Sequence, residues 1–201
     1  MIITPEEPLW IGGYAFRDHP SEGKLLDVWA KALALEDKNG KRAVLVSIEV
    51  SAIHKSLSDE IRGRLQAKYS LSKDQVILNS THTHSGPETN PAFLKDLVEK
   101  KKVASYAKKL EDKIIDLVGT AIKNLQPVKL FSENGVTRFQ VNRRNNIEYK
   151  NQLASQFKGP NDFAVPVIKA VNESGNIVAI VFGYACHSSV LRDYRISGDY
   201  P

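Results

Sequence analysis

Three histidines stand just beyond two apolar segments of this sequence. His82 and His84 form an H-x-H pair shortly after the apolar residues 76–78, and His187 follows the apolar residues 177–182. Side chains two positions apart on a strand share a face, so we expect His82 and His84 to point the same way at a strand end. Neutral imidazole is the commonest metal ligand in proteins. A bare H-x-H pair is more often two unrelated polar loop residues, but the third histidine in a similar setting favours a metal or substrate site.

Other reactive side chains near these histidines have weaker patterns. Ser85 follows His84 directly, but neighbours on an extended strand rarely point at each other, so we interpret Ser85 as shaping the loop rather than as a nucleophile. Glu88 is either a general base or, as we expect, a solvated loop carboxylate. His54 lacks a companion and is interpreted as a surface or hydrogen-bonded histidine. Cys186 is the single cysteine, so no internal disulfide forms, and we expect a buried thiol rather than a ligand.

The first half of the chain predicts a β-hairpin followed by a βαβ unit. Residues 26–35 and 43–50 are apolar segments joined by an Asn-Gly turn, the pattern of a tight hairpin. Ser56 or Ser58 is expected to cap the next helix, and residues 75–79 are expected to form a third strand. Strand, helix and strand at this spacing predict parallel strands with a right-handed crossover. Ligand sites in such sheets lie beyond the carboxyl ends of the strands, which is where the H-x-H pair stands.

The second half predicts one long helix and further strands. The apolar positions of the helix follow a single stripe. The expected elements are a helix over 103–125, strands over 128–131 and 136–141, a polar loop over 144–163, and a hairpin of 164–171 with 177–185. Together the elements predict a mixed α/β fold, in which one or more β-sheets with hairpins and a βαβ unit are flanked by helices. We expect residues 1–201 to form a single domain.

Composition and charge narrow the class of protein. The 201 residues are 42% hydrophobic and 25% charged, which is typical of a globular protein, and no apolar run approaches the roughly 18 residues of a membrane helix. The net charge of +5 comes largely from lysines around the predicted long helix. A basic face for phosphates or anionic lipid is one interpretation, but acidic residues alternate with the lysines and favour a solvated helix face. No aromatic residues are interleaved, so we expect no nucleic-acid partner.

Four separated stretches carry a resemblance to a known family. They are residues 13–17 (Gly-Tyr-Ala-Phe-Arg), residues 79–87 (Asn-Ser-Thr-His-Thr-His-Ser-Gly-Pro), residues 141–144 (Val-Asn-Arg-Arg), and residues 185–189 (Ala-Cys-His-Ser-Ser) with residues 196–201 (Ile-Ser-Gly-Asp-Tyr-Pro). In their residues and their order along the chain, these stretches resemble the motifs of the neutral/alkaline (non-lysosomal) ceramidase family, in particular its wider bacterial branch. Glu88 departs from the family pattern, which has small residues after the Ser-Gly-Pro.

This resemblance implies a zinc site and its neighbours. It implies that His82 and His187 bind zinc together with a glutamate and a tyrosine that come later in the family's sequences. It implies that His84 relays a proton or holds the substrate, a task suited to imidazole at neutral pH. Arg143 would contact the substrate beside the scissile carbonyl, where a permanently charged guanidinium steadies an oxyanion.

The same resemblance implies what surrounds the reaction. The substrate would be an N-acylsphingosine or another small-molecule or lipid amide, with peripheral membrane contact compatible with such a substrate. The location would be secreted or periplasmic, although the first six residues show no secretory pattern. Because family sequences continue well beyond position 201, we expect this chain to be the N-terminal portion of a longer catalytic domain. The oligomeric state is left open.

Two hypotheses of different classes follow. The first is a zinc-dependent hydrolase that cleaves an amide (N-acyl) bond with metal-activated water. The second is a catalytically inactive structural or binding domain of the same fold, whose metal site is incomplete in this chain. An amidohydrolase barrel, which also uses H-x-H, fits poorly because eight βα units need about 250 residues and the hairpins break the alternation.

Overall fold

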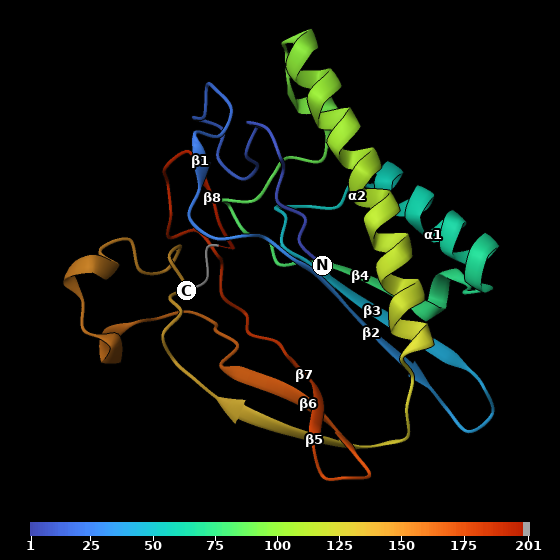
Figure 1. Ribbon diagram of the computed structural model, residues 1–201. Helices are drawn as coiled ribbons and strands as arrows, with labels where there is room; N and C mark the ends of the chain where they lie inside the picture. The colour runs from blue at the N-terminus through green and yellow to red at the C-terminus, as the bar shows by residue number, and fades with distance from the viewer. Residues whose placement is uncertain (199–201) are drawn as a thin grey trace. The chain divides into compact units, whose positions relative to one another are not determined.

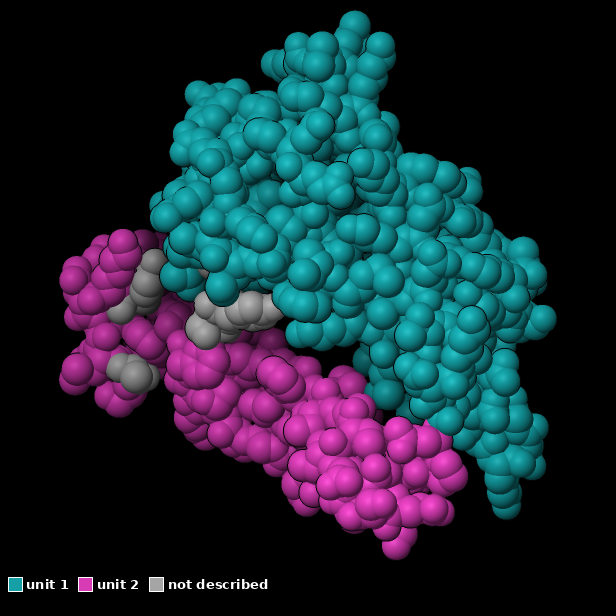
Figure 2. All heavy atoms as spheres, in the orientation of Figure 1, with its two compact units in different colours: residues 1–125, 188–201 teal, residues 126–187 magenta. Residues whose placement is uncertain are grey.

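Two compact units make up the chain (Figures 1 and 2). The computed structural model describes residues 1–198. The first unit contains Met1–Leu125 and the residues from Ser188 onward, and the second contains Gln126–His187. The expectation that residues 1–201 belong to one domain of a longer protein stays a prediction. Asp199–Pro201 of the closing motif lie outside the described residues.

A three-stranded sheet forms the centre of the first unit. β2 (Ala30–Glu36) pairs antiparallel with β3 (Arg42–Ile48), which pairs parallel with β4 (Val76–Ser80). The hairpin turn is held by Asp37, whose Oδ1 accepts from the backbone amides of residues 39 and 41 at 2.9 and 2.8 Å. Gly40 has a φ of +77°, the conformation that favours glycine. The predicted hairpin and βαβ unit are confirmed.

Two helices lie together on one side of this sheet (Figure 1). α1 (Lys55–Tyr69) connects β3 to β4, and α2 (Leu97–Lys123) packs against β2 and α1. Asp96 caps α2 by accepting from the next turn's amides. The cap of α1 is His54 rather than the expected serine at 56 or 58, because the helix begins earlier than its capping pattern indicated. No helix in the described part of the chain combines the length and apolar character that a membrane crossing requires.

The hydrophobic core of the first unit lies between these helices and the sheet. Fully buried aliphatic side chains come from β3, α1 and α2, and each contributes about 1.5–3 kcal/mol to stability. The N-terminal segment adds Ile3, Leu9 and Ile11 to this core. The short strand β1 (Gly23–Lys24) pairs parallel with β8 (Arg195–Ile196), which returns the end of the described chain to the first unit. Residues 188–198 are thereby brought back beside the N-terminal segment.

The second unit is an antiparallel sheet with a long connection. β5 (Val128–Val136), β6 (Ala164–Asn172) and β7 (Ile177–Phe182) are ordered β5-β6-β7, and the loop between β5 and β6 carries the short 3₁₀ turns η3 (Tyr149–Asn151) and η4 (Ala154–Gln156). The predicted hairpin is confirmed. Two strands expected over 128–131 and 136–141 are instead the single strand β5, because pairing with β6 ends at Val136. β7 ends before position 185, since its next neighbour Pro166 cannot donate to the ladder.

Candidate metal centre

The H-x-H pair lies in a loop rather than on a strand. β4 ends at Ser80, and His82 has a φ of +61°, a left-handed conformation that is uncommon outside glycine. The alternation expected for a strand therefore does not apply. The rings nevertheless meet, with their Nε2 atoms 3.4 Å apart and their planes at 87°. The two imidazoles point at one place because the chain turns at His82.

A backbone carbonyl orients the ring of His82. Its Nδ1 lies 2.7 Å from the carbonyl oxygen of Ser51, just beyond the end of β3. A carbonyl only accepts, so Nδ1 carries the proton and the lone pair of Nε2 is left to face the partner imidazole. Hydrogen bonding of one ring nitrogen to a carbonyl is the usual way in which a protein fixes the ligating tautomer of a histidine.

His84 is buried and fixed from several sides. Its amide donates to the carbonyl of Ser188 at 3.1 Å, and its ring meets Tyr14 edge-on with centroids 4.6 Å apart. Gly13 packs so closely that a Cβ there would lie 2.5 Å from His84 Cγ, and its φ is +98°. Glycine is thus required at this position both for its backbone conformation and for the close approach of the imidazole.

Arg17 joins the histidine loop to the two neighbouring segments. The guanidinium is 5% exposed and donates to three carbonyls, those of Gly12 at 2.8 Å, His84 at 2.6 Å and Asp193 at 2.9 Å. Its planar fork of donors suits such a convergence of acceptors. The sequence resemblance included Arg17 in its first motif but assigned it no task, and the structure shows that it holds the loop in place.

Thr83, between the two histidines, and Ser85, directly after them, are buried and hold the loop by hydrogen bonds. Thr83 Oγ1 accepts from the amide of Ser85 at 3.1 Å and donates to the carbonyl of Ser197 at 3.2 Å. The amide of Ser197 returns a bond to the carbonyl of Ser85 at 3.0 Å. Ser85 itself is fully buried. This supports its interpretation as a residue that shapes the loop.

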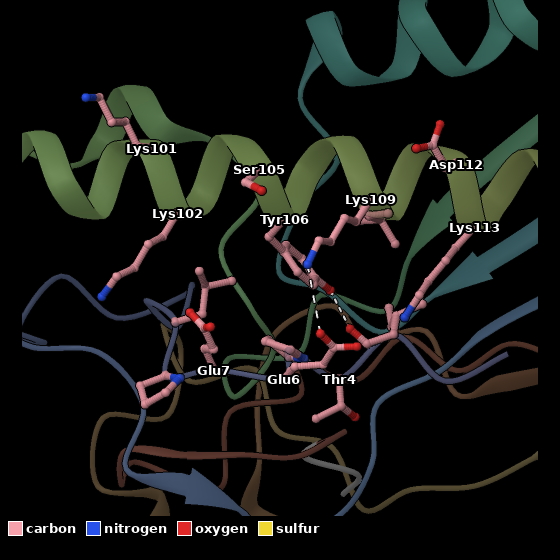
Figure 3. A pocket seen from close by; sticks show the side chains of 15 residues that line it. Thr4, Glu6, Glu7, Lys101, Lys102, Ser105, Tyr106, Lys109, Asp112 and Lys113 are labelled. Atoms are coloured by element: carbon pink, nitrogen blue, oxygen red, sulfur yellow. Dashed lines mark hydrogen bonds and ion pairs between the residues drawn. The ribbon is translucent and has the colours of Figure 1, made fainter.

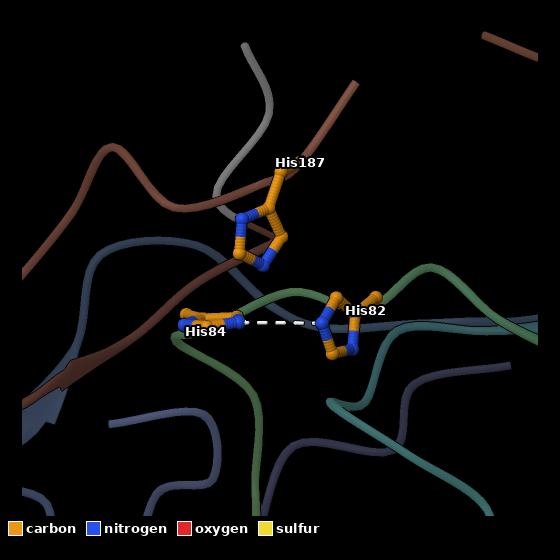
Figure 4. A group of neighbouring side chains, drawn as sticks. All are labelled: His82, His84 and His187. Carbon is orange, nitrogen blue, oxygen red and sulfur yellow. Dashed lines mark hydrogen bonds between the residues drawn. The ribbon is translucent and has the colours of Figure 1, made fainter. Parts of the chain in front are cut away.

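His187 is the residue at which the second unit ends, and it is bonded to Ser188 of the first. Each of the three imidazoles offers one nitrogen, and these nitrogens all lie within 4.8 Å of one another (Figure 4).

The adjacent Cys186 is partly buried, and burial raises the pKa of its thiol. It is not part of the group that could hold a metal ion among residues 1–198.

The donor set fits a metal ion such as zinc. Zinc accepts imidazole nitrogens at about 2.0–2.1 Å in a tetrahedron, which places two such nitrogens roughly 3.3 Å apart. The His82–His84 separation of 3.4 Å matches that edge, and the three nitrogens of the group all lie within 4.8 Å of one another. His82 and His187 are exposed and His84 is buried, so the group is open on one side.

Arg143 lies in the second unit, in the connection after β5. The chain turns over residues 143–145, and both Arg143 and Arg144 are exposed. The buried Asn146 holds this turn by donating from Nδ2 to the carbonyls of Asn142 at 2.7 Å and Lys158 at 2.8 Å. The contact of Arg143 with a substrate stays a prediction.

Glu88 and His54 form a pair that the sequence did not indicate. The Glu88 side chain is only 12% exposed, and its Oε1 lies 3.9 Å from His54 Nε2. The same oxygen accepts from the amides of Thr89 and Asn90, both at 2.8 Å. The expectation of a solvated loop carboxylate is wrong, because the loop folds back toward the start of α1. No local pattern links two residues so far apart in the sequence.

A hollow between the N-terminal segment and α2 collects several of the lysines (Figure 3). Acids accompany them: Lys109 lies 3.9 Å from Glu6, and Lys102 lies 2.7 Å from Glu99. Tyr106 is buried beneath and donates to the carbonyl of Ile3 at 2.8 Å. Paired charges support the interpretation of this helix surface as a solvated face.

Comparisons with known proteins agree with the fold. The family model "Neutral/alkaline non-lysosomal ceramidase, N-terminal" matches residues 5–200. The neutral ceramidase of Pseudomonas aeruginosa is 26% identical over 192 residues, 88% of this chain and 27% of that protein. Neutral ceramidase A of Dictyostelium discoideum is 28% identical over 198 residues, 93% of this chain and 28% of that protein.

A solved structure gives the same result. The crystal structure of neutral ceramidase from Pseudomonas aeruginosa has a TM-score of 0.79 and 25% identity, and the match covers 98% of this chain and 32% of that one. The mixed α/β fold class is thereby confirmed. Across these comparisons the chain spans about a third or less of each protein it matches. Relatives come from bacteria and eukaryotes alike, so the bacterial branch stays a prediction.

Proposed function

The chain belongs to the neutral/alkaline non-lysosomal ceramidase family, and from this premise we propose that it is the metal-binding N-terminal part of an amide hydrolase. The relatives named above are ceramidases, and ceramide is an N-acyl amide. The proposed reaction is hydrolysis of the amide bond of a lipid or small-molecule N-acyl amine. The observation that carries the proposal is the group of three imidazole nitrogens within 4.8 Å of one another.

The proposed metal ligands are His82 and His187, with zinc as the ion. The proton on His82 Nδ1, fixed by the carbonyl of Ser51, supports ligation through Nε2. When bound, zinc would supply Lewis acidity that polarises an amide carbonyl and lowers the pKa of a coordinated water to about 7. The residues of this chain would hold that ion and place the groups around it.

His84 is proposed to move a proton or to hold the substrate. Its Nε2 faces His82, while its backbone and ring are fixed by Ser188, Arg17 and Tyr14. A buried, immobilised imidazole beside a metal ligand suits proton transfer at neutral pH, because little reorganisation is needed. Arg143 is proposed to steady negative charge that develops on the carbonyl oxygen.

The second candidate function is a structural or binding domain without activity. The described residues contribute three imidazoles and no carboxylate to the metal group, and the chain spans 27% of the Pseudomonas relative. A three-histidine site still leaves an open position for water in other zinc enzymes, so ligand count does not decide between the two. Metal retention and amide turnover are the measurements that separate them.

Zinc content of the purified 201-residue chain tests the proposal. We expect about one zinc per chain, lost in the double variant His82→Ala/His187→Ala and kept in His19→Ala, since His19 is outside the group of three histidines and stacks on Tyr194. Turnover of a fluorogenic N-acyl amine, added with zinc, then distinguishes the hydrolase from the inactive domain. Zinc retained equally by the double variant would overturn the assignment of these two ligands.

A further inference from the structure

Residues 188–198, the returning segment, are held against the N-terminal segment by a very short ladder. β1 and β8 contribute two residues each and lie side by side (Figure 1). Even a longer isolated pair of strands is only marginally stable in water. Side chains next to this ladder must therefore help to hold the returning segment in place.

Tyr194, directly before β8, makes several of these additional contacts. Its hydroxyl donates to Oδ1 of Asp18 at 2.9 Å, and its carbonyl accepts from the amide of Glu22 at 2.8 Å. Its ring stacks on the imidazole of His19, with the centroids 3.7 Å apart and the planes at 11°. One tyrosine of the returning segment is thus held by three residues that come shortly before β1.

Both ring nitrogens of His19 face a carboxylate. Nδ1 lies 2.7 Å from Oδ1 of Asp18, and Nε2 lies 3.1 Å from Oε1 of Glu22. An ionised carboxylate only accepts, and a neutral imidazole carries one N–H, so the neutral ring donates to one acid and turns a lone pair toward the other. The imidazolium donates to both acids, and a cation is also attracted to the face of an aromatic ring. The geometry therefore fits the charged form of His19.

Two arginines lie near this cluster and are engaged with other groups. Arg17 has its Cζ 6.0 Å from the centroid of the Tyr194 ring, and it donates to three backbone carbonyls, including that of Asp193. Arg195 donates from Nε to the carboxylate of Asp193 at 2.8 Å. A guanidinium keeps its charge at every physiological pH, whereas imidazole changes its charge near neutrality. The charge that responds to pH in this cluster is therefore that of His19.

We propose that protonation of His19 clamps the returning segment onto β1, so that the segment is held firmly at acidic pH and more loosely at alkaline pH. The charged ring bridges Asp18 and Glu22 and packs against Tyr194. The neutral ring loses one of the two bridges, and the stack on the tyrosine loses its charge. The two-residue ladder then holds the segment with less support from its side chains.

The two carboxylates determine the direction of this pH dependence. Their hydrogen bonds, first that of Asp18 and then that of Glu22, raise the pKa of His19 above its ordinary value of 6.5. A raised pKa in the folded state gives a stabilisation that is complete below the ordinary value and is lost as the pH rises through the higher folded value. The bond from His19 lowers the pKa of Asp18, and desolvation raises that of Tyr194, so both of these groups move away from neutrality.

Hydrogen–deuterium exchange of the 201-residue chain tests the proposal. Peptides that cover the returning segment are compared between the parent and His19→Gln at about pH 6 and at about pH 9. Comparison at one pH removes the pH dependence of intrinsic exchange. We expect the variant to exchange about two- to fivefold faster at the lower pH, a size suited to exposed ion pairs, and at nearly the parent's rate at the higher pH. A ratio that is the same at both pH values would overturn the proposal.

An NMR titration of the histidine ring protons measures the charge directly. The His19 signals, identified by their absence in His19→Gln, should give a pKa above 6.5. That pKa should fall in Asp18→Asn and by less in Glu22→Gln, because the bond to Asp18 is the shorter one. A parent pKa at or below 6.5 would refute the clamp.

Two further variants complete the test. His54→Gln is the matched control, because His54 also lies beside a glutamate but caps α1, and it should leave exchange of the returning segment unchanged. Should His19→Gln fail to fold by circular dichroism, Glu22→Gln replaces it and should speed the exchange at about pH 6. Unchanged exchange in that folded variant would count against the clamp. No metal or substrate is used, so failure of this proposal and failure of the proposed function are separate results.

Discussion

The two units of this chain differ in how they bury apolar side chains. Among the described residues, every fully buried apolar side chain belongs to the first unit except Ala170. In the second unit Phe131, Ile180 and Phe182 are 50%, 55% and 71% exposed. Helices cover the sheet of the first unit, whereas the described residues of the second form three strands and short 3₁₀ turns. A sheet gains stability by burying a face against another layer, so the first unit carries most of the stability measurable in this chain.

The candidate site residues show the same difference in packing between the two units. His82 and His84 lie in the well-packed unit, held by Arg17, Gly13 and the segment after Ser188. Arg143 lies on an exposed turn of the other unit. Paired substitutions, one in each unit, test whether this contrast in packing is also a contrast in energy.

The largest effect is expected from Arg17. Arg17→Met removes a buried cation and leaves three carbonyls without their donor, so the free energy of unfolding should fall by about 3–5 kcal/mol. Arg144→Met, on the exposed turn of the second unit, should change it by less than about 0.5 kcal/mol. Urea denaturation followed by circular dichroism gives both values. Similar losses in the two variants would remove the distinction between the units.

A truncation in each unit tests the core directly. Leu110→Ala creates a cavity in the packed interface of α2 and should cost about 3 kcal/mol, since Leu110 is 1% exposed. Ile180→Ala, on β7, should cost less than about 1 kcal/mol because that side chain is already half in water. Thermal melts of the two variants compare them. A large loss from Ile180→Ala would show that the second unit buries this face in solution.

Two glycines with positive φ separate steric conflict from backbone strain. Gly13→Ala, at φ +98°, would drive a methyl group into His84, and we expect a loss of about 2–3 kcal/mol in the free energy of unfolding. Gly175→Ala, at φ +82° in the turn between β6 and β7, meets no atom within 4 Å and should cost only about 1 kcal/mol of strain. Urea denaturation gives both values, and a loss from Gly13→Ala no larger than that from Gly175→Ala would show that His84 tolerates displacement.

The smallest effect is expected from an ion pair between α1 and α2. Burial alone would raise the pKa of Glu111, but its bonds to Arg64 at 2.6 Å and to Lys108 prevail and lower it. A carboxyl with a lowered pKa in the folded state stabilises the protein above its ordinary pKa of about 4.5, and this stabilisation is lost as the pH falls below that value. Glu111→Gln should therefore cost about 1 kcal/mol at pH 7, discounted because Arg64 is partly exposed.

Denaturation at pH 7 and at pH 3 checks that sign. The difference between parent and Glu111→Gln should shrink at the lower pH, whereas Glu133→Gln on the exposed strand β5 should show no difference at either pH. A Glu111→Gln penalty that grows on acidification would contradict the direction of the pKa shift.

Local patterns in the sequence were enough to predict most of the elements. The apolar stripe of α2, the Asn-Gly hairpin and the parallel β3–β4 pair depend on side-chain periodicity and turn chemistry, which neighbouring residues determine. The predicted boundaries of strands and helices differ from the observed ones where contacts with distant residues determine them. β5 continues to Val136 because Ala164 is there to pair with it, and α1 begins at Lys55 without a serine cap.

The site shows the same division between local and distant causes. Sequence alone identified the three histidines. Their positions after apolar segments and the motifs around them are local features of the sequence. Only the tertiary structure decided how the imidazoles meet, since a left-handed residue at His82, a carbonyl at Ser51 and the returning segment at Ser188 act together. For this reason the sequence did not predict the role of Arg17 or the pairing of Glu88 with His54. Their roles come from residues brought together by folding, and such distances follow from packing rather than from the order of residues along the chain.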